Sequence, residues 1–153
     1  MFEFLLSFLV RVLLLLAFSF SWRITARKYI SSGTVASAYD SWTQDKLLER
    51  LWGEHIHLGF YPLGKNNIDF RRAKVQFVHE LVKWSGLDKL PRGSRILDVG
   101  CGIGGSSRIL AEYYGFNVTG ITISPAQVKR ARELTPQGLN LSLIHISEPT
   151  RHA

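Results

Sequence analysis

The chain has 153 residues, of which 46% are hydrophobic and 20% charged, with a net charge of +7 and a single cysteine. One cysteine excludes an intramolecular disulfide framework and fits a reducing compartment. The basic residues form no dense stripe with interleaved aromatic side chains, which argues against a nucleic-acid-binding protein. Composition and pattern divide the chain into residues 1–28, 29–90, 91–140 and 141–153.

The first part is an almost unbroken apolar segment, Phe4 to Trp22, followed by Arg23, Arg27 and Lys28. Its length comes close to the ~20 residues that cross a bilayer as a helix. We therefore predict an N-terminal transmembrane helix with a basic flank, and the positive-inside rule places the rest of the chain on the cytoplasmic side. A cleaved signal peptide and a helix lying on the membrane surface remain alternatives.

The second part is predicted to be a helical cap region. Gly33 to Trp52 and Ile68 to Trp84 carry apolar residues at helical spacing. Between them lie His55 and His57, a spacing that invites a metal-site interpretation. No third ligand of suitable type and spacing accompanies the pair, so we predict no metal. A structural or solvated role is the alternative for each histidine.

The third part alternates strand and helix patterns. Arg95 to Val99 is an apolar run typical of a buried parallel strand, and the glycine-rich turn Gly100 to Gly105 follows it. A helix pattern over Ser106 to Tyr114 and a second strand pattern over Phe116 to Ile123 come next, and a capping box at Ser124 opens another helix. This order predicts an α/β, Rossmann-like fold, of which the chain contains the first two parallel strands.

The glycine-rich turn is the strongest functional signal. Glycines let a ligand approach the backbone, and a helix N-terminus offers amide donors to an anionic group. The spacing also fits a dinucleotide fingerprint, or a tight turn without a ligand. Asp98, however, can face a cationic aminoacyl group and would repel a pyrophosphate, and the second strand ends at Thr122 without the acid that holds a ribose diol. Both features favour S-adenosylmethionine (SAM); a NAD-dependent oxidoreductase remains the alternative.

The motifs also carry a family resemblance. Ile96 to Gly105 resembles motif I of the class I SAM-dependent methyltransferases, and Gly120 to Pro125 with Gln127 resembles the variant second motif of tocopherol, sterol and cyclopropane-forming enzymes. Ser32 to Leu134 is similar to the 2-methyl-6-phytylbenzoquinone and tocopherol methyltransferase family. The resemblance implies a C-methyltransferase for a membrane-soluble prenylated benzoquinol in tocopherol or plastoquinone biosynthesis. A related methyltransferase for tocopherol, a sterol or another lipid, and a non-catalytic membrane-tethered domain, remain alternatives.

The resemblance further implies the site residues and the location. Residues expected to bind SAM are Asp98, Gly100, Cys101, Gly102, Gly104, Thr122, Ile123 and Gln127. Asp98, Gly100 and Gly102 would line the methionine side of SAM. Thr122, Ile123 and Gln127 would lie near its ribose and adenine, although Gln127 also fits a purely capping role. Tyr39 and His57 are the candidates for the base that deprotonates the quinol. The expected location is a cyanobacterial inner or thylakoid membrane, or the plastid envelope.

The last part looks like a translated sequencing adaptor. Leu141 to Arg151 matches, residue for residue, one frame of a common transposase sequencing adaptor. The sequence therefore predicts a non-native tail from residue 141, to be left out of fold reasoning, and His145 and His152 are excluded as ligands or bases. It also predicts that the natural coding sequence is cut near Asn140 and that this N-terminal fragment has no methyltransferase activity of its own.

Overall fold

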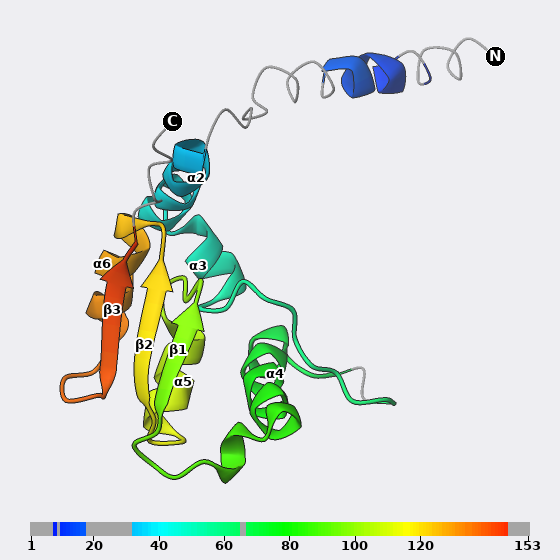
Figure 1. Ribbon diagram of the computed structural model, residues 1–153. Coiled ribbons are helices and arrows are strands. Elements are labelled where there is room, and N and C mark those ends of the chain that lie inside the picture. The colour runs from blue at the N-terminus through cyan, green and yellow to red at the C-terminus, as the bar shows by residue number, and fades with distance from the viewer. Residues whose placement is uncertain (1–7, 9, 18–31, 65–66, 147–153) are drawn as a thin grey trace. The chain divides into compact units, whose positions relative to one another are not determined.

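The computed structural model describes residues 8, 10–17, 32–64 and 67–146 (Figure 1). Residues 1–31 and 32–153 form two compact units. In the first unit residues 8 and 10–17 are helical, and most of the predicted anchor lies outside the described residues. Within the described ranges, no helix combines the length and hydropathy that a membrane span requires. The elements of the second unit are α2 (Ser32–Gln44), α3 (Leu47–Trp52), α4 (Phe70–Ser85), the 3-10 helix η1 (Leu87–Lys89), β1 (Arg95–Val99), α5 (Gly105–Glu112), β2 (Asn117–Thr122), α6 (Pro125–Leu134) and β3 (Leu141–His145).

The sheet consists of parallel strands in the order β1-β2-β3. Asp98 pairs with Gly120, and Thr122 pairs with His145. The predicted strand, glycine turn, helix, strand, helix order is therefore present, as is the parallel Rossmann-like sheet. Since all strands run in one direction, their carboxyl ends meet at one edge, where ligands bind in folds of this class.

The third strand differs from the expectation of two strands. Leu141–His145 lies in the segment that we predicted to be a non-native tail, yet it pairs in register with β2. Its alternation of apolar and polar residues is a strand pattern, and Leu143 packs against Cys101, Val128 and Ala131. Any segment with this pattern can satisfy the open edge of β2, so the pairing does not test where residues 141–153 come from.

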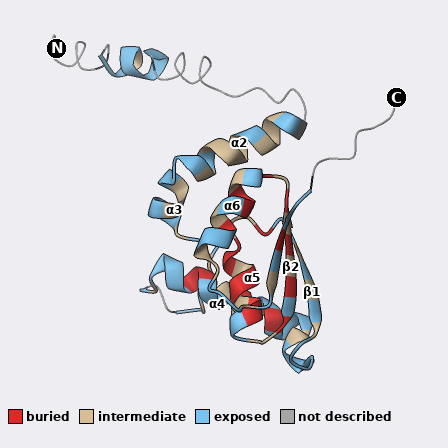
Figure 2. Cartoon of the chain, turned by 90° about the vertical axis from the view of Figure 1, so that its left-hand side faces the viewer, coloured by how far each residue is buried: buried red, intermediate tan, exposed pale blue. Residues whose placement is uncertain are grey.

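Helices α5 and α6 cover one face of the sheet (Figure 1). Figure 2 shows buried residues in α4, α5, β2 and α6, whereas β1 is largely exposed. The main core cluster consists of Val82, Leu110, Ala111, Phe116 and Val118. On the opposite face, Leu97 and Val99 of β1 remain 60% and 70% exposed. The covered face is the side on which the sheet and helices hold the glycine turn.

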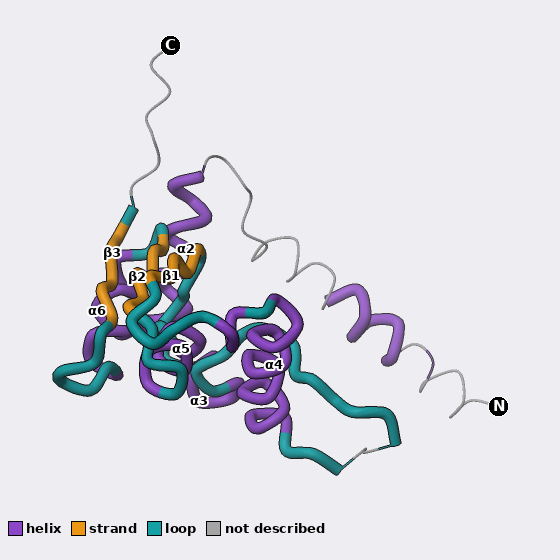
Figure 3. Tube along the Cα trace, turned by 60° about the horizontal axis from the view of Figure 1, so that its bottom comes forward, coloured by secondary structure: helices purple, strands orange, loops and turns teal. Residues whose placement is uncertain are grey.

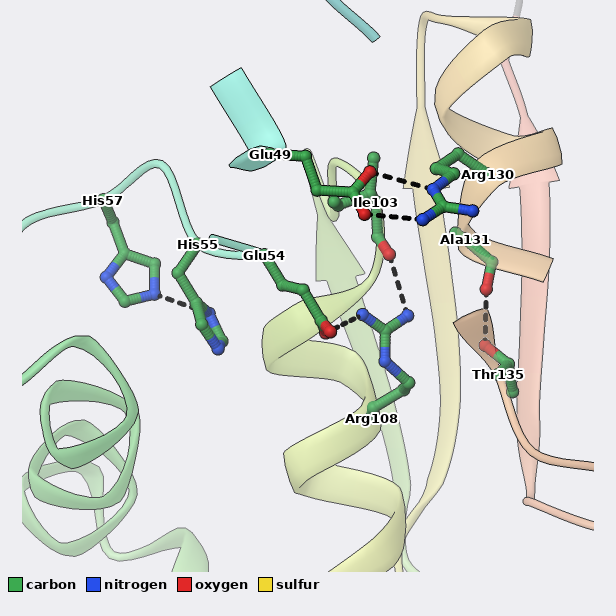
Figure 4. A network of polar contacts seen from close by, with 9 residues as sticks. All are labelled: Glu49, Glu54, His55, His57, Ile103, Arg108, Arg130, Ala131 and Thr135. Carbon is green, nitrogen blue, oxygen red and sulfur yellow. Dashed lines mark hydrogen bonds and ion pairs between the residues drawn. The ribbon is translucent and has the colours of Figure 1, made fainter. Parts of the chain in front are cut away.

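The helix that we predicted over Gly33 to Trp52 is interrupted. Helix α2 ends at Gln44, Lys46 adopts a left-handed conformation with φ of 52°, and α3 begins at Leu47. The break directs α3 so that Glu49 forms a two-pronged ion pair with Arg130 of α6 (Figure 4). The hydrogen bonds from the Arg130 guanidinium lower the pKa of Glu49.

A polar contact also joins helix α2 to α6. The Asp40 carboxylate accepts hydrogen bonds from the Ser124 hydroxyl and from the backbone amide of Ala126, at the first turn of α6. Ser124 itself caps that helix by accepting from the Gln127 amide at 3.1 Å, as its capping box predicts. A carboxylate at a helix N-terminus is stabilised by the unpaired amides and the helix dipole.

Replacing Asp40 with alanine is expected to lower the free energy of unfolding by about 1–2 kcal/mol, because a charged N-terminal cap is lost. Urea denaturation followed by circular dichroism measures the change. Asp45→Ala removes an exposed acid next to the break between the helices and serves as the control. Equal stability of the two variants would show that the contact with α6 contributes nothing.

Candidate cofactor and active site

A cavity of about 570 Å³ opens where β1 and β2 end. It is lined by nine of the ten residues that the sequence nominated: Tyr39, His57, Asp98, Gly100, Cys101, Gly102, Thr122, Ile123 and Gln127. The tenth, Gly104, lies outside the cavity wall. A Cβ on Gly104 would approach the Arg108 guanidinium at 3.0 Å and the Ala131 side chain at 3.3 Å, so its position serves the packing of α5 against α6.

The glycine turn presents backbone to this cavity. Gly100 and Gly102 have φ of 80° and 55°, a conformation that side chains other than glycine rarely adopt, and open space lies where their Cβ atoms would be. The turn is held from beneath, because the amides of Gly100 and Cys101 both donate to the Ile121 carbonyl, at 2.8 and 3.1 Å. These two glycines therefore leave a ligand room against the backbone.

Asp98 is fixed by a residue that the sequence reasoning missed. The Ser107 hydroxyl, fully buried in the first turn of α5, donates to Asp98 Oδ2 at 2.5 Å. Oδ1 has no hydrogen-bond partner among the residues that the structure describes. Asp98 thus presents one carboxylate oxygen at the cavity wall while the other is tied down. The only sequence signal for this contact is the spacing: Ser107 lies nine residues after Asp98, in the first turn of the helix that follows the strand.

Thr122 and Gln127 form a second polar pair at the cavity. The Thr122 hydroxyl donates to Gln127 Oε1 at 2.7 Å and accepts from the Ser124 amide at 3.3 Å. Because its oxygen is occupied, Gln127 has its side-chain nitrogen left as a donor, without a protein partner in the described ranges. The Gln127 side chain therefore lies in the cavity wall and does not complete the capping box, because the Ser124 amide donates to Thr122 instead.

Cys101 lies in the turn as a small buried residue. Burial, followed by the charge of Asp98, raises the pKa of its thiol to about 11, so the thiol stays protonated at neutral pH. A protonated thiol is a poor nucleophile. In the described part of the chain, no group of three or more His, Cys, Asp or Glu side chains is arranged to hold a metal ion.

His55 and His57 lie side by side in the segment that follows α3 (Figure 4). His57 Nδ1 is 2.8 Å from the Leu58 carbonyl oxygen, which can only accept, so this nitrogen carries a proton. In the neutral ring Nε2 must then accept, and its partner at 3.1 Å is Nδ1 of His55. The lone pair that stays available in the histidine pair is consequently on His55 Nε2, not on His57.

Protonation of His55 is disfavoured in the folded chain. Burial, and then the neighbouring His57, lower its pKa from 6.5 to about 4. Between these values the unfolded chain binds the proton more readily than the folded chain does. Stability is therefore expected to fall as the pH drops from 6.5 to 4, by about 1–3 kcal/mol after allowance for partial exposure. Urea denaturation of wild type and His55→Gln across this range measures the effect, and identical pH slopes would refute it.

Three contacts clamp the histidine segment to the rest of the unit. The buried Lys74 ammonium donates to the carbonyl oxygens of Trp52 and His55, at 3.1 and 2.7 Å. Arg108 of α5 forms an ion pair with Glu54 (Figure 4). A Cβ on Gly105 would lie 2.8 Å from Cε1 of His55 and 2.9 Å from the Glu54 carbonyl oxygen. Gly105, the last glycine of the turn, therefore leaves the space into which this segment packs. The spacing of the glycines did not predict this role.

Known proteins similar to this chain include methyltransferases and cyclopropane synthetases. The family model of mycolic acid cyclopropane synthetases matches residues 67–141. The chain is 65% identical over 116 residues to the 2-methyl-6-phytyl-1,4-hydroquinone methyltransferase of Synechocystis sp., an alignment that covers 74% of this chain and 36% of that protein. These matches confirm the expected resemblance to the class I SAM-dependent methyltransferases.

Two further relatives extend the comparison. The chloroplastic tocopherol O-methyltransferase of Arabidopsis thaliana is 38% identical over 95 residues, which cover 58% of this chain and 27% of that enzyme. The crystal structure of a putative sarcosine dimethylglycine methyltransferase from Galdieria sulphuraria superposes with a TM-score of 0.60 at 30% identity, over 71% of this chain and 42% of that one. The chain spans about a third of the length of the curated relatives it matches.

Proposed function

We propose that the protein is a SAM-dependent C-methyltransferase whose acceptor is a membrane-soluble prenylated benzoquinol. The observation that carries the proposal is Asp98, held by Ser107 at the end of β1 beside an open glycine turn. The 65% identity to a 2-methyl-6-phytyl-1,4-hydroquinone methyltransferase supports the acceptor class. Since the chain covers 36% of that relative, the activity is proposed for the whole protein.

The residues of the cavity fit SAM. Oδ1 of Asp98 would accept from the ammonium of the aminoacyl part, and the amides at the turn and at the start of α5 would donate to its carboxylate. At the other end, the free side-chain nitrogen of Gln127 would donate to the ribose or adenine. Thr122 would act mainly by orienting Gln127, because its hydroxyl is already committed.

When bound, SAM supplies an electrophilic methyl group on a sulfonium. The protein's tasks are then alignment, exclusion of water and removal of the acceptor's hydroxyl proton, which makes the ring carbon more nucleophilic. Tyr39 and His57 line the cavity as predicted candidates for the base. The hydrogen-bond directions add His55, whose Nε2 holds the available lone pair and whose Nδ1 proton can pass to His57 as Nε2 gains one.

A membrane location follows from the acceptor and from the sequence. A prenylated quinol resides in the bilayer, and the apolar segment Phe4 to Trp22 with its basic flank would keep the active site beside it. We propose that this segment anchors the protein in a cyanobacterial or plastid membrane with the methyltransferase unit on the cytoplasmic or stromal side. Cyanobacterial and chloroplastic relatives support this location.

Ligand-observed NMR on the full chain tests the cofactor. Saturation-transfer signals are expected from S-adenosylhomocysteine (SAH) and not from NADH at the same concentration, and this method detects weak as well as tight binding. Signals from NADH with none from SAH, while the proton spectrum shows a folded chain, would overturn the proposal in favour of an oxidoreductase. That the 153-residue chain transfers no methyl group by itself stays a prediction, testable with methyl-labelled SAM and a prenylated benzoquinol.

A further inference from the structure

The segment between α3 and α4 has two unlike faces. His55, His57 and Gly59 are partly buried, whereas the intervening Ile56 and Leu58 are exposed. This period of two is that of extended backbone, in which successive side chains point to opposite sides. The histidines therefore face the cavity. Ile56 is exposed but lines the same cavity, so the outward-facing apolar side begins at Leu58.

The apolar face continues to the end of the segment. Leu58 is 84% exposed, Tyr61 is 51% exposed and Leu63 is fully exposed. In Figures 1 and 3 the segment leaves α3 and runs outward beside α4, clear of the sheet. Large apolar side chains gathered on one protruding loop mark a surface that meets a partner or a membrane.

Two contacts keep these side chains pointing outward. The Phe60 amide donates to the Ala73 carbonyl at 2.8 Å, and a Cβ on Gly59 would lie only 2.6 Å from Cβ of Ala73. The backbone of the loop is thus pressed against the first turns of α4. Because the inner side is filled by this contact, Leu58 and Leu63 cannot be covered by folding the loop inward.

The charged side chains beside the loop indicate which kind of partner it meets. Residues 56–74 carry four basic side chains and one acidic side chain. Of the basic ones, Lys74 is buried and Arg71 donates to the Arg50 carbonyl, whereas Arg72 is exposed. The one acid, Asp69, is occupied as the N-cap of α4, accepting from the amides of Arg71 and Arg72. The Arg72 guanidinium has no partner in the described ranges. Apolar and aromatic residues bordered by basic ones match the interface of an anionic bilayer.

We propose that residues 56–63 form a membrane-contact loop, which inserts Leu58, Tyr61 and Leu63 into the interface of an anionic lipid bilayer. Arg72 would contact the headgroups, and the histidine pair on the opposite side of the same segment would then sit beside the bilayer surface. The proposal extends the proposed function, from which it takes the lipid-soluble acceptor. It is separate from the N-terminal anchor.

Site-specific fluorescence on the full chain tests the loop. Leu63→Cys and Trp84→Cys are labelled with an environment-sensitive NBD dye; Trp84 is an 85% exposed apolar residue at the other end of α4, and the buried Cys101 is left in place, with labelled wild type as the blank. With vesicles of equimolar phosphatidylcholine and phosphatidylglycerol, the dye at position 63 is expected to shift to the blue and to become severalfold less quenchable by iodide. The dye at position 84 should remain unchanged, and Arg72→Gln should weaken the response at position 63.

Each other outcome overturns the proposal. If the dye at position 63 stays as quenchable as that at position 84, the loop does not enter the bilayer. Equal shielding of both positions would indicate adsorption of the whole unit, and shielding of position 63 that grows with protein concentration without vesicles would indicate contact between copies of the chain. None of these readouts depends on SAM, so a failure here is distinct from a failure of SAH binding.

Discussion

Asp98→Asn is expected to weaken SAH binding by about 10- to 100-fold, because a charge-assisted hydrogen bond contributes about 1.5–3 kcal/mol. Asparagine has the shape of aspartate and can still accept from Ser107, so the buried contact with α5 is kept. The change removes the negative charge that would meet the ammonium of the aminoacyl part. Titration of SAH into the full chain, followed by ligand-observed NMR or calorimetry, measures the loss.

Two companion variants separate charge from position. Asp45→Asn removes an exposed acid outside the cavity and should leave the affinity unchanged. Ser107→Ala keeps the Asp98 charge but frees its carboxylate to rotate, so a smaller loss is expected. If Asp98→Asn binds SAH as tightly as wild type, the carboxylate does not contact the ligand.

Lys74→Met is expected to lower the free energy of unfolding by about 2–3 kcal/mol and to release the histidine segment, because two carbonyl groups lose a charged donor. Methionine retains the apolar stem, so the packing of α4 is largely kept. The ammonium donates to the carbonyl oxygen of Trp52, at the end of α3, and to that of His55, in the segment that carries the histidines. Urea denaturation measures the stability, and hydrogen exchange of the amides of residues 53–60 measures the release.

The same helix offers a matched control. Lys83 is exposed and forms an i,i+3 ion pair with Glu80 at the surface. Exposed pairs of this kind contribute little, so Lys83→Met should change stability by less than about 0.5 kcal/mol. If Lys74→Met and Lys83→Met lower stability equally, hydrogen bonds from water can replace those of the buried Lys74 ammonium.

The fold was predictable where local pattern decides it. The apolar run at β1, the glycine turn and the capping box at Ser124 each have one plausible local structure, and together they imply a parallel sheet. The residues that hold the site were not predictable in this way. Asp40 contacts a helix 84 residues further along the chain, and Lys74 reaches back to Trp52 from α4. A side chain's partner at such a separation depends on how the elements pack, which periodicity does not encode.

The glycines and β3 show two limits of motif reading. The spacing of the turn predicts one purpose for all its glycines, but the structure shows three. Gly100 and Gly102 leave open space, and Gly104 packs against α6. Gly105 leaves the space into which the histidine segment packs. At β3, strand pairing needs only a suitable alternation and an open neighbouring edge. A segment with no evident place in the fold can therefore occupy a strand position.

Comparison of SAH with its analogue lacking the α-amino group tests the central claim most directly. If the Asp98 carboxylate receives the ammonium, wild type should bind SAH about tenfold or more tightly than the analogue, and Asp98→Asn should bind both equally. A preference for SAH that survives unchanged in Asp98→Asn would contradict the account, as would tighter binding of the deaminated analogue by wild type.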